Sequence, residues 1–201
     1  MITATVLGHR PIHYPVSRYW KYDKAIERVL AGIISDQIDM NNIGTVVSNF
    51  NVGIDLAACI AAAKCKIDLK GILPYSNMQE DWGRRHQLIF AKALIYSIQS
   101  GGLEYNTGRM ISEVKIERAR SNSLDISDVV ICLWRGEPGH VLKWMNYAKV
   151  HDKKIINVWD LFVKKSQRYT EEHYHEEAKA SADQYNKRKI KYGTGSLFSQ
   201  L

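Results

Sequence analysis

The chain has 201 residues, of which 45% are hydrophobic and 24% are charged, and its formal net charge is +7 at pH 7. This length fits one globular domain with a short appendage, and no apolar run approaches the ~18–20 residues of a membrane span, so no membrane partner is expected. The positive charge favours an anionic partner but does not distinguish a nucleotide from a nucleic acid.

Strands and helices alternate along the first 160 residues. The predicted strands are Thr3–Gly8, Gly44–Ser48, Leu69–Pro74, Val129–Trp134 and Lys154–Trp159. The predicted helices are Asp23–Met40, Gly53–Lys64, Trp82–Ala93, Ile111–Ser123 and Val141–His151. Residues 93–98 fit either a short fourth strand or a helix end, and a loop with Gly101, Gly102 and Gly108 follows. This alternation predicts an α/β, Rossmann-like, doubly wound and mostly parallel sheet with helices on both faces.

The last 41 positions differ in character, so we predict a domain over residues 1–160 and a C-terminal extension over residues 161–201. Tyr169–Arg188 is polar, with Tyr174, Ala178, Ala182 and Tyr185 at helical spacing. This pattern predicts a solvated helix that packs on one face of the domain or against another subunit. The final residues, Gly193–Leu201, are predicted to be a mobile tail.

Two strand-to-helix junctions point to a ligand site. The stretch Ser48-Asn49-Phe50-Asn51-Val52-Gly53-Ile54-Asp55 joins an apolar strand to an apolar helix, and Leu7-Gly8-His9-Arg10-Pro11 closes the first strand. Backbone N–H groups at a helix N-terminus attract phosphate and other anions. Ligands of doubly wound sheets bind beyond the carboxyl ends of the strands. The junctions therefore predict a nucleotide-type pocket along that edge of the sheet.

Charged side chains at these junctions each have two interpretations. Arg10 would hold a phosphate bidentately or form a surface salt bridge, and His9 would contact a base or phosphate or cap the turn. Asp55 would bind a ribose hydroxyl or stabilise the helix dipole. Outside these junctions, Arg118 and Arg120 precede the Asp125–Asp128 segment that leads into the next strand, and they would contact a phosphate or be ordinary basic residues at a helix end.

The segment after the third predicted strand adds further candidates. Tyr75 and Trp82 would stack on a base, or they would pack in the core or at its rim. Gln79 would read a base edge or lie in solvent. Glu80 is, with Asp55, one of two acids placed near the predicted pocket.

The ordered set of motifs resembles one superfamily. These motifs are Gly8-His9-Arg10-Pro11, Ser48 to Asp55, Pro74 with Gln79 and Trp82, and Asp125-Ile126-Ser127-Asp128. Over residues 3–159 they resemble the YpsA-like branch of the SLOG superfamily, which includes the LOG phosphoribohydrolases and DNA-processing protein A. The resemblance implies a Rossmann-like fold that binds a nucleotide or nucleotide-derived ligand, and a homo-oligomer.

Departures from the family pattern bear on chemistry. Asn49 stands where the family usually has glycine, and Gly136-Glu137-Pro138-Gly139-His140 replaces a Gly-Gly-Thr turn. Pro138 removes one N–H donor. LOG enzymes place a catalytic glutamate shortly after this turn, whereas Val141-Leu142-Lys143-Trp144 contains no acid. The resemblance therefore supports ligand binding by this chain better than it supports LOG-type hydrolysis. Gly136, Gly139 and His140 would close the predicted site.

Three functions follow, in order of preference. The first is binding of a nucleotide or nucleotide-derived ligand, for sensing or sequestration. The second is hydrolysis of the N-glycosidic bond of nucleoside monophosphates, in which Asp55 and Glu80 would be the catalytic carboxylates. The third is single-stranded DNA binding, although the acids Glu171, Glu172, Glu176 and Glu177 interrupt any basic stripe in the extension.

Cysteine and histidine usage gives no sign of a metal or cofactor. Cys59, Cys65 and Cys132 lie in apolar surroundings without a CxxC pair, which predicts reduced core thiols in a cytoplasmic protein. His173 and His175 are two residues apart, so they would point to different faces of a helix. We expect neither a metal site nor a cofactor.

Overall fold

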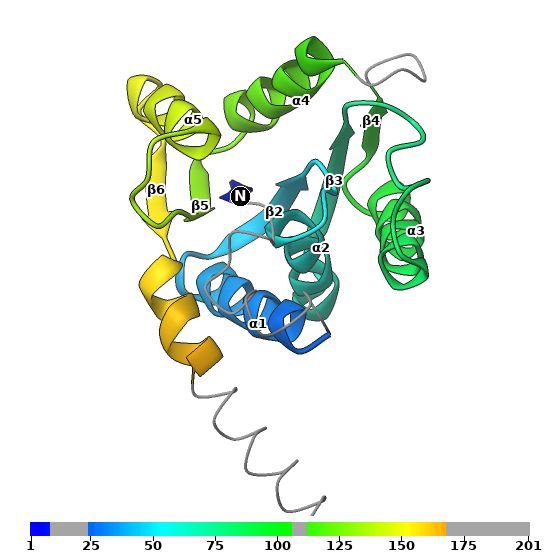
Figure 1. Ribbon diagram of the computed structural model, residues 1–201, viewed down its shortest axis with the longest axis horizontal. Helices are drawn as coiled ribbons and strands as arrows, with labels where there is room; N and C mark the ends of the chain where they lie inside the picture. The colour runs from blue at the N-terminus through cyan, green and yellow to red at the C-terminus, as the bar shows by residue number, and fades with distance from the viewer. Residues whose placement is uncertain (9–23, 106–111, 168–201) are drawn as a thin grey trace, which may run out of the picture. The chain divides into compact units, whose positions relative to one another are not determined.

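The computed structural model describes residues 1–8, 24–105 and 112–167. These residues form a six-stranded sheet with the order β4-β3-β2-β1-β5-β6, and every neighbouring pair is parallel (Figure 1). The strands are β1 (Ile2–Gly8), β2 (Ile43–Ser48), β3 (Asp68–Leu73), β4 (Leu103–Tyr105), β5 (Val129–Leu133) and β6 (Lys154–Asn157). The helices are α1 (Lys24–Met40), α2 (Ile54–Cys65), α3 (Arg84–Gln99), α4 (Glu113–Asp125) and α5 (His140–Val150). The predicted Rossmann-like α/β fold is confirmed.

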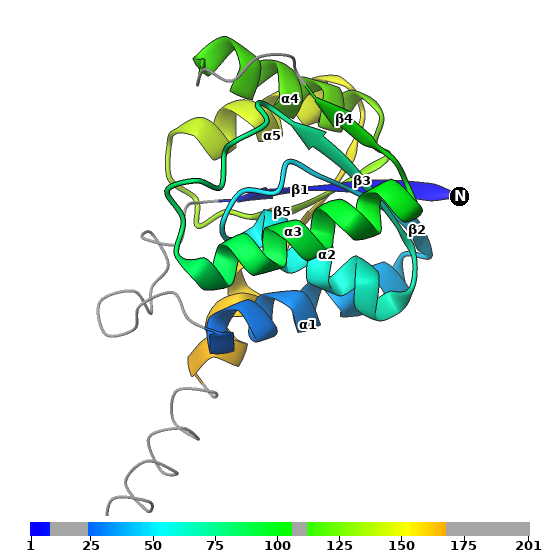
Figure 2. The ribbon, with the colours of Figure 1, turned by 90° about the vertical axis from the view of Figure 1, so that its right-hand side faces the viewer.

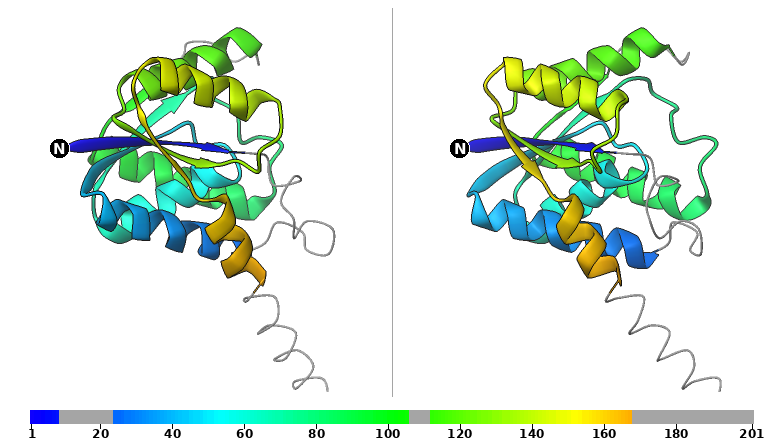
Figure 3. Two further views of the ribbon diagram at one scale, coloured as in Figure 1. Left: turned by 90° about the vertical axis from the view of Figure 1, so that its left-hand side faces the viewer. Right: turned by 60° about the vertical axis from the view of Figure 1, so that its left-hand side comes forward.

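Helices cover both faces of the sheet. α1, α2 and α3 lie on one face, and α4 and α5 lie side by side on the other (Figures 2 and 3). The chain passes outward from β1 to β4 and then returns through α4 to β5, which pairs with the opposite side of β1. The strand order therefore reverses between β1 and β5, and such a switch point is where ligands of this architecture bind.

Burial on both faces explains the continuous apolar strands. In β5, Val129, Ile131 and Leu133 belong to the core under α1 to α3, and Val130 and Cys132 belong to the core under α5. Successive side chains of a strand point to opposite faces, so a central parallel strand needs apolar residues at every position. This continuous apolar pattern is why β5 could be predicted from the sequence.

Helix α2 packs closely between its neighbours because of its small side chains. Ala57, Ala58, Ala61 and Ala62 are fully buried, and α2 contacts both α1 and the sheet. An alanine side chain lets helix and strand backbones approach closely and loses no rotamer freedom on burial. The Ala-rich sequence of α2 therefore accounts for its close packing.

One edge of the sheet differs from the prediction. The fourth strand is Leu103–Tyr105, in the segment predicted to be a loop, whereas residues 93–98 continue α3. Gly101 approaches β3 so closely that a Cβ there would lie 2.6 Å from the backbone carbonyl of Leu69. Ser97 Oγ donates to the Gly102 carbonyl. These contacts direct a short three-residue strand onto β3.

The chain divides into two compact units, Met1–Val163 and Lys164–Leu201. In the second unit, the structure describes only residues 164–167. The predicted helix Tyr169–Arg188 and the predicted mobile tail Gly193–Leu201 lie outside the described residues. In the described part of the chain, no helix combines the length and the apolar character that crossing a membrane requires.

The thiols give a prediction about alkaline stability. Cys59 and Cys132 are buried and free, and burial raises the pKa of both, that of Cys132 to about 12. A thiol whose pKa is higher in the folded protein than in the unfolded chain, where it is near 9, makes its full contribution to stability below pH 9. This contribution is lost as the pH rises toward 12. We expect each thiol to contribute a loss of roughly 1.4 kcal/mol in the free energy of unfolding per pH unit above 9.

Urea unfolding at pH 8 and pH 10 measures this loss. A Cys59→Ala/Cys132→Ala variant is the control, because its other titrating groups are unchanged. An equal loss in the wild type and the variant would contradict the prediction.

Candidate functional site

The carboxyl edge of the sheet is tightly built where β1, β5 and α2 meet. Gly8 ends β1 and pairs with Leu133 of β5. A Cβ at Gly8 would lie 2.9 Å from Cγ2 of Ile54 and 3.1 Å from Cβ of Leu133. Any side chain at this position would therefore push apart the end of β1 and the start of α2.

The turn into α2 contains two residues with a positive φ angle. Phe50 has a φ of 58° and Gly53, the N-cap residue, has a φ of 114°. Gly53 has no side chain to cap the helix, and Asp55 in the first turn favours its positive end. Glycine adopts a φ of this kind without strain, so it suits the N-cap position of this turn.

A second helix begins in a similar way on the other side of β1. Gly139 is the N-cap residue of α5, with a φ of 141° and no side-chain cap, and Gly136 has a φ of 99°. A Cβ at either glycine would meet nothing within 4 Å, so this loop borders open space. His140 is exposed, and its Nε2 accepts a hydrogen bond from Trp144 Nε1 at 3.1 Å.

A buried polar network lies beneath the α2 turn. Asp55 is 4% exposed and Arg120 is 8% exposed. One carboxylate oxygen of Asp55 accepts from the Asn49 backbone N–H at 3.1 Å, and the other faces Arg120 Nη2 at 3.5 Å. Arg120 Nη1 also donates to the Val6 carbonyl at 2.8 Å. The ion pair thus ties α4 to both β1 and α2.

Asn49 extends this network to the next strand. Its Nδ2 donates to the Ile72 carbonyl at 2.7 Å, to Ser123 Oγ at 2.9 Å and to the Ala119 carbonyl at 3.2 Å. Ser48 Oγ accepts from the Phe50 N–H at 3.1 Å. An asparagine at this position therefore cross-links β2, β3 and α4, which a glycine could not do.

The candidates after β3 form a separate group. Trp82 is half-buried and packs edge-on against Phe90, with ring centroids 5.5 Å apart. Tyr75 also packs against the core, and partial burial raises the pKa of its hydroxyl. Gln79 is half-buried, while Glu80 is exposed and accepts a hydrogen bond from Asn77.

The structure brings six predicted residues together at the β1–β2 end of the edge: Gly8, Ser48, Asn49, Gly53, Asp55 and Arg120. Gly136, Gly139 and His140 follow β5, which pairs with β1. Tyr75, Gln79, Glu80 and Trp82 follow β3, two strands away. Arg118 is exposed on α4, and His9 and Arg10 lie outside the described residues.

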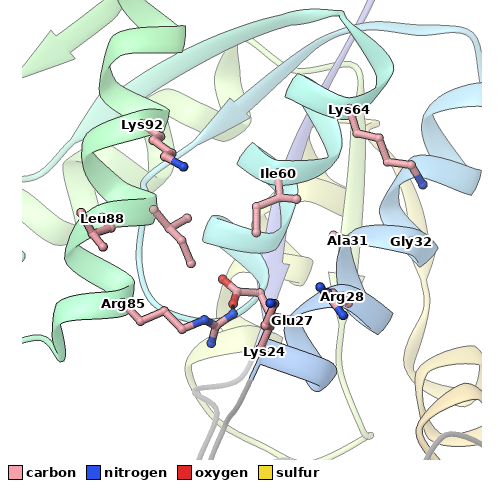
Figure 4. A pocket seen from close by; sticks show the side chains of 11 residues that line it. Lys24, Glu27, Arg28, Ala31, Gly32, Ile60, Lys64, Arg85, Leu88 and Lys92 are labelled. Atoms are coloured by element: carbon pink, nitrogen blue, oxygen red, sulfur yellow. Dashed lines mark hydrogen bonds and ion pairs between the residues drawn. The ribbon is translucent and has the colours of Figure 1, made fainter.

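Sequence reasoning missed a hollow of about 480 Å³ between α1, α2 and α3 (Figure 4). Its lining includes the cations Lys24, Arg28, Lys64 and Lys92, which come from three helices. Lys24 and Arg28 are four residues apart and so share a helix face, which was the available signal. In the ranges that the structure describes, no group of three His, Cys, Asp or Glu side chains could hold a metal ion.

Comparisons with known proteins support the fold. No family model and no curated protein matches the chain. The structure is similar to DNA processing protein A from Helicobacter pylori, with 16% identity, a TM-score of 0.51, and coverage of 83% of this chain and 73% of that chain. The Streptococcus pneumoniae DNA processing protein A gives 14% identity, a TM-score of 0.49 and coverage of 77% of this chain. Our chain spans about half of the Streptococcus protein, covering 49% of it.

Proposed function

We propose that the carboxyl edge of the sheet, around β1 and β5, binds a nucleotide or a nucleotide-derived ligand. The observation that carries the proposal is the pair of glycine-capped helix starts at Gly53 and Gly139, which follow the two strands that flank β1. The N-cap residue of each start is a glycine, which has no side chain of its own to place over the first turn. Phosphate groups suit such positions, because backbone N–H groups and the helix dipole both favour negative charge.

Binding is better supported than N-glycosidic hydrolysis. A catalytic carboxylate must reach the sugar, yet both carboxylate oxygens of Asp55 already face donors inside the protein. Glu80 lies beyond β3 rather than at the switch point between β1 and β5. Asp55 therefore has a structural role at the carboxyl edge of the sheet. A protein that senses or sequesters its ligand needs no catalytic role for this carboxylate.

Single-stranded DNA is the second candidate ligand. The net charge of +7 favours a polyanion, and the Helicobacter pylori protein of similar fold has a described single-stranded DNA binding mode. The same backbone N–H groups would hold a phosphate of the strand. Affinity would then fall steeply with salt, with a slope in log–log form of about −0.7 per phosphate contacted.

A substitution beside the α5 start tests the proposal. Pro138 is exposed between the two open glycines, so Pro138→Asp places a carboxylate there without removing packing. We expect the affinity for a bound phosphate ligand to fall by roughly tenfold or more, because like charges repel across a short distance. Calorimetry with AMP, ADP-ribose, NAD, cyclic nucleotides and a dT oligonucleotide measures this change.

Val114→Asp is the matched control, since it adds the same charge at an exposed first-turn position of α4. Equal weakening by both variants would contradict a site at the α5 start. Failure of every nucleotide and oligonucleotide to bind would contradict the proposed function. Mass spectrometry of the recovered ligand shows whether it leaves intact or as free base and sugar phosphate.

A further inference from the structure

The hollow between α1, α2 and α3 is lined by side chains of these three helices, which cover one face of the sheet (Figures 2 and 4). We call it the basic groove, and define it by its cations Lys24 and Arg28 of α1, Lys64 of α2 and Lys92 of α3. Among the described residues, none of these four cations takes part in an ion pair. Four cations around one hollow create a site for negative charge.

The fifth cation of the groove is already neutralised. Arg85 reaches from α3 to Glu27 of α1 and forms an ion pair with it (Figure 4). Glu27 is 1% exposed, and its Oε1 has no hydrogen-bond partner among the described residues. A buried acceptor of this kind is costly when unpaired, so it favours an occupant that brings a hydroxyl or amide donor.

The floor of the groove is aliphatic. Ala31, Ile60 and Ile89 contribute to it, and a second hollow of about 290 Å³ between α2 and α3 shares Ile60, Ile89 and Lys92 with it. The two hollows therefore lie next to each other. On α3, the side chains of Leu88 and Ile95 are 56% and 57% exposed, and they extend the apolar surface along this helix.

The lining distinguishes between classes of anionic partner. Single-stranded nucleic acids bind on aromatic side chains that stack with bases, but Tyr96 is the sole aromatic side chain among the described residues that line either hollow. An aliphatic floor with cations at its margins instead complements a helix that carries apolar side chains on one face and carboxylates beside them.

We propose that the basic groove docks an acidic amphipathic helix of a partner protein. Apolar side chains of that helix would cover the floor and the exposed stripe of α3, and its carboxylates would pair with the four cations.

Fluorescence anisotropy with a labelled designed peptide tests the proposal. The peptide has sixteen residues, with leucines spaced to form one helical face and glutamates flanking them, and a scrambled peptide of equal composition lacks the face. We expect Lys92→Glu to weaken binding of the designed peptide by roughly tenfold, and Leu88→Gln to weaken it by a similar factor.

Matched controls lie on α5, which covers the other face of the sheet. Lys149→Glu reverses an exposed charge, and Val150→Gln replaces an apolar side chain that is 79% exposed. Neither control should change the affinity. No binding of the designed peptide, equal binding of the scrambled peptide, or equal effects of the controls would overturn the proposal.

Two further outcomes would assign the groove to another occupant and so overturn the proposal. Displacement of the peptide by a dT oligonucleotide that binds more tightly, and is itself weakened by Lys92→Glu, would identify a nucleic-acid site. Sedimentation that shows a homodimer broken by Leu88→Gln would identify a second copy of the chain as the occupant.

Discussion

Replacing Arg120 by methionine is expected to lower the free energy of unfolding by about 3–5 kcal/mol, because Asp55 would remain buried without its cation. Arg120 and Asp55 are 8% and 4% exposed, and the arginine also donates to the Val6 carbonyl of β1. Its removal therefore leaves a buried charge and a backbone acceptor unpaired. Urea denaturation of the wild type and Arg120→Met at neutral pH measures the difference.

Two comparisons separate this effect from the loss of any arginine. Arg135 pairs with Glu137 at the surface, so Arg135→Met should cost at most about 1 kcal/mol. Adding Asp55→Asn to Arg120→Met removes the buried charge and should restore part of the stability. An additive or larger loss in the double variant would contradict the ion-pair explanation.

Replacing Phe50 by alanine is the second large effect, with an expected cost of about 3–5 kcal/mol. The ring is fully buried, and it packs edge-on against Phe90 with centroids 5.9 Å apart. The backbone of Phe50 is left-handed, with a φ of 58°. Glycine adopts this conformation freely, so Phe50→Gly should be less destabilising than Phe50→Ala by about 1 kcal/mol.

Phe162 provides the matched comparison, because it is equally buried but lies in a helical segment that follows β6, residues 159–167. At that position, substitution by glycine should lower the free energy of unfolding by about 1 kcal/mol more than substitution by alanine. Chemical denaturation of the four variants tests this reversal of order. The same order at both positions would show that the left-handed backbone of Phe50 carries no cost.

The central strands and helices were predictable because their apolar residues follow simple periods. β5 is a continuous apolar run, and α1 repeats Ile26, Leu30, Ile33 and Ile34 on its buried face. β4 was missed because Leu103–Tyr105 is three residues long and has one half-buried residue. The end of α3 was ambiguous because Ile95 and Ile98 are apolar yet exposed, so they mark no buried face.

The predicted site was partly recoverable for a different reason. The glycines at 53 and 139 could be located from local sequence, since each precedes a helix and follows a strand. The pairing of Asp55 with Arg120 could not be located from local sequence, because the two residues are 65 positions apart. Only the return of α4 across the sheet brings them together. Their predicted roles toward a phosphate or ribose stay predictions.

The ends of the sheet bear on how copies of this protein could associate. Its border strands, β4 and β6, have three and four residues, and Glu104 and Lys154 place charges on them. Short, charged borders discourage the pairing of one sheet with another through backbone hydrogen bonds. Self-association of this domain would thus proceed through side chains on its helices, which makes it open to tuning by single surface substitutions and resistant to fibril-like growth.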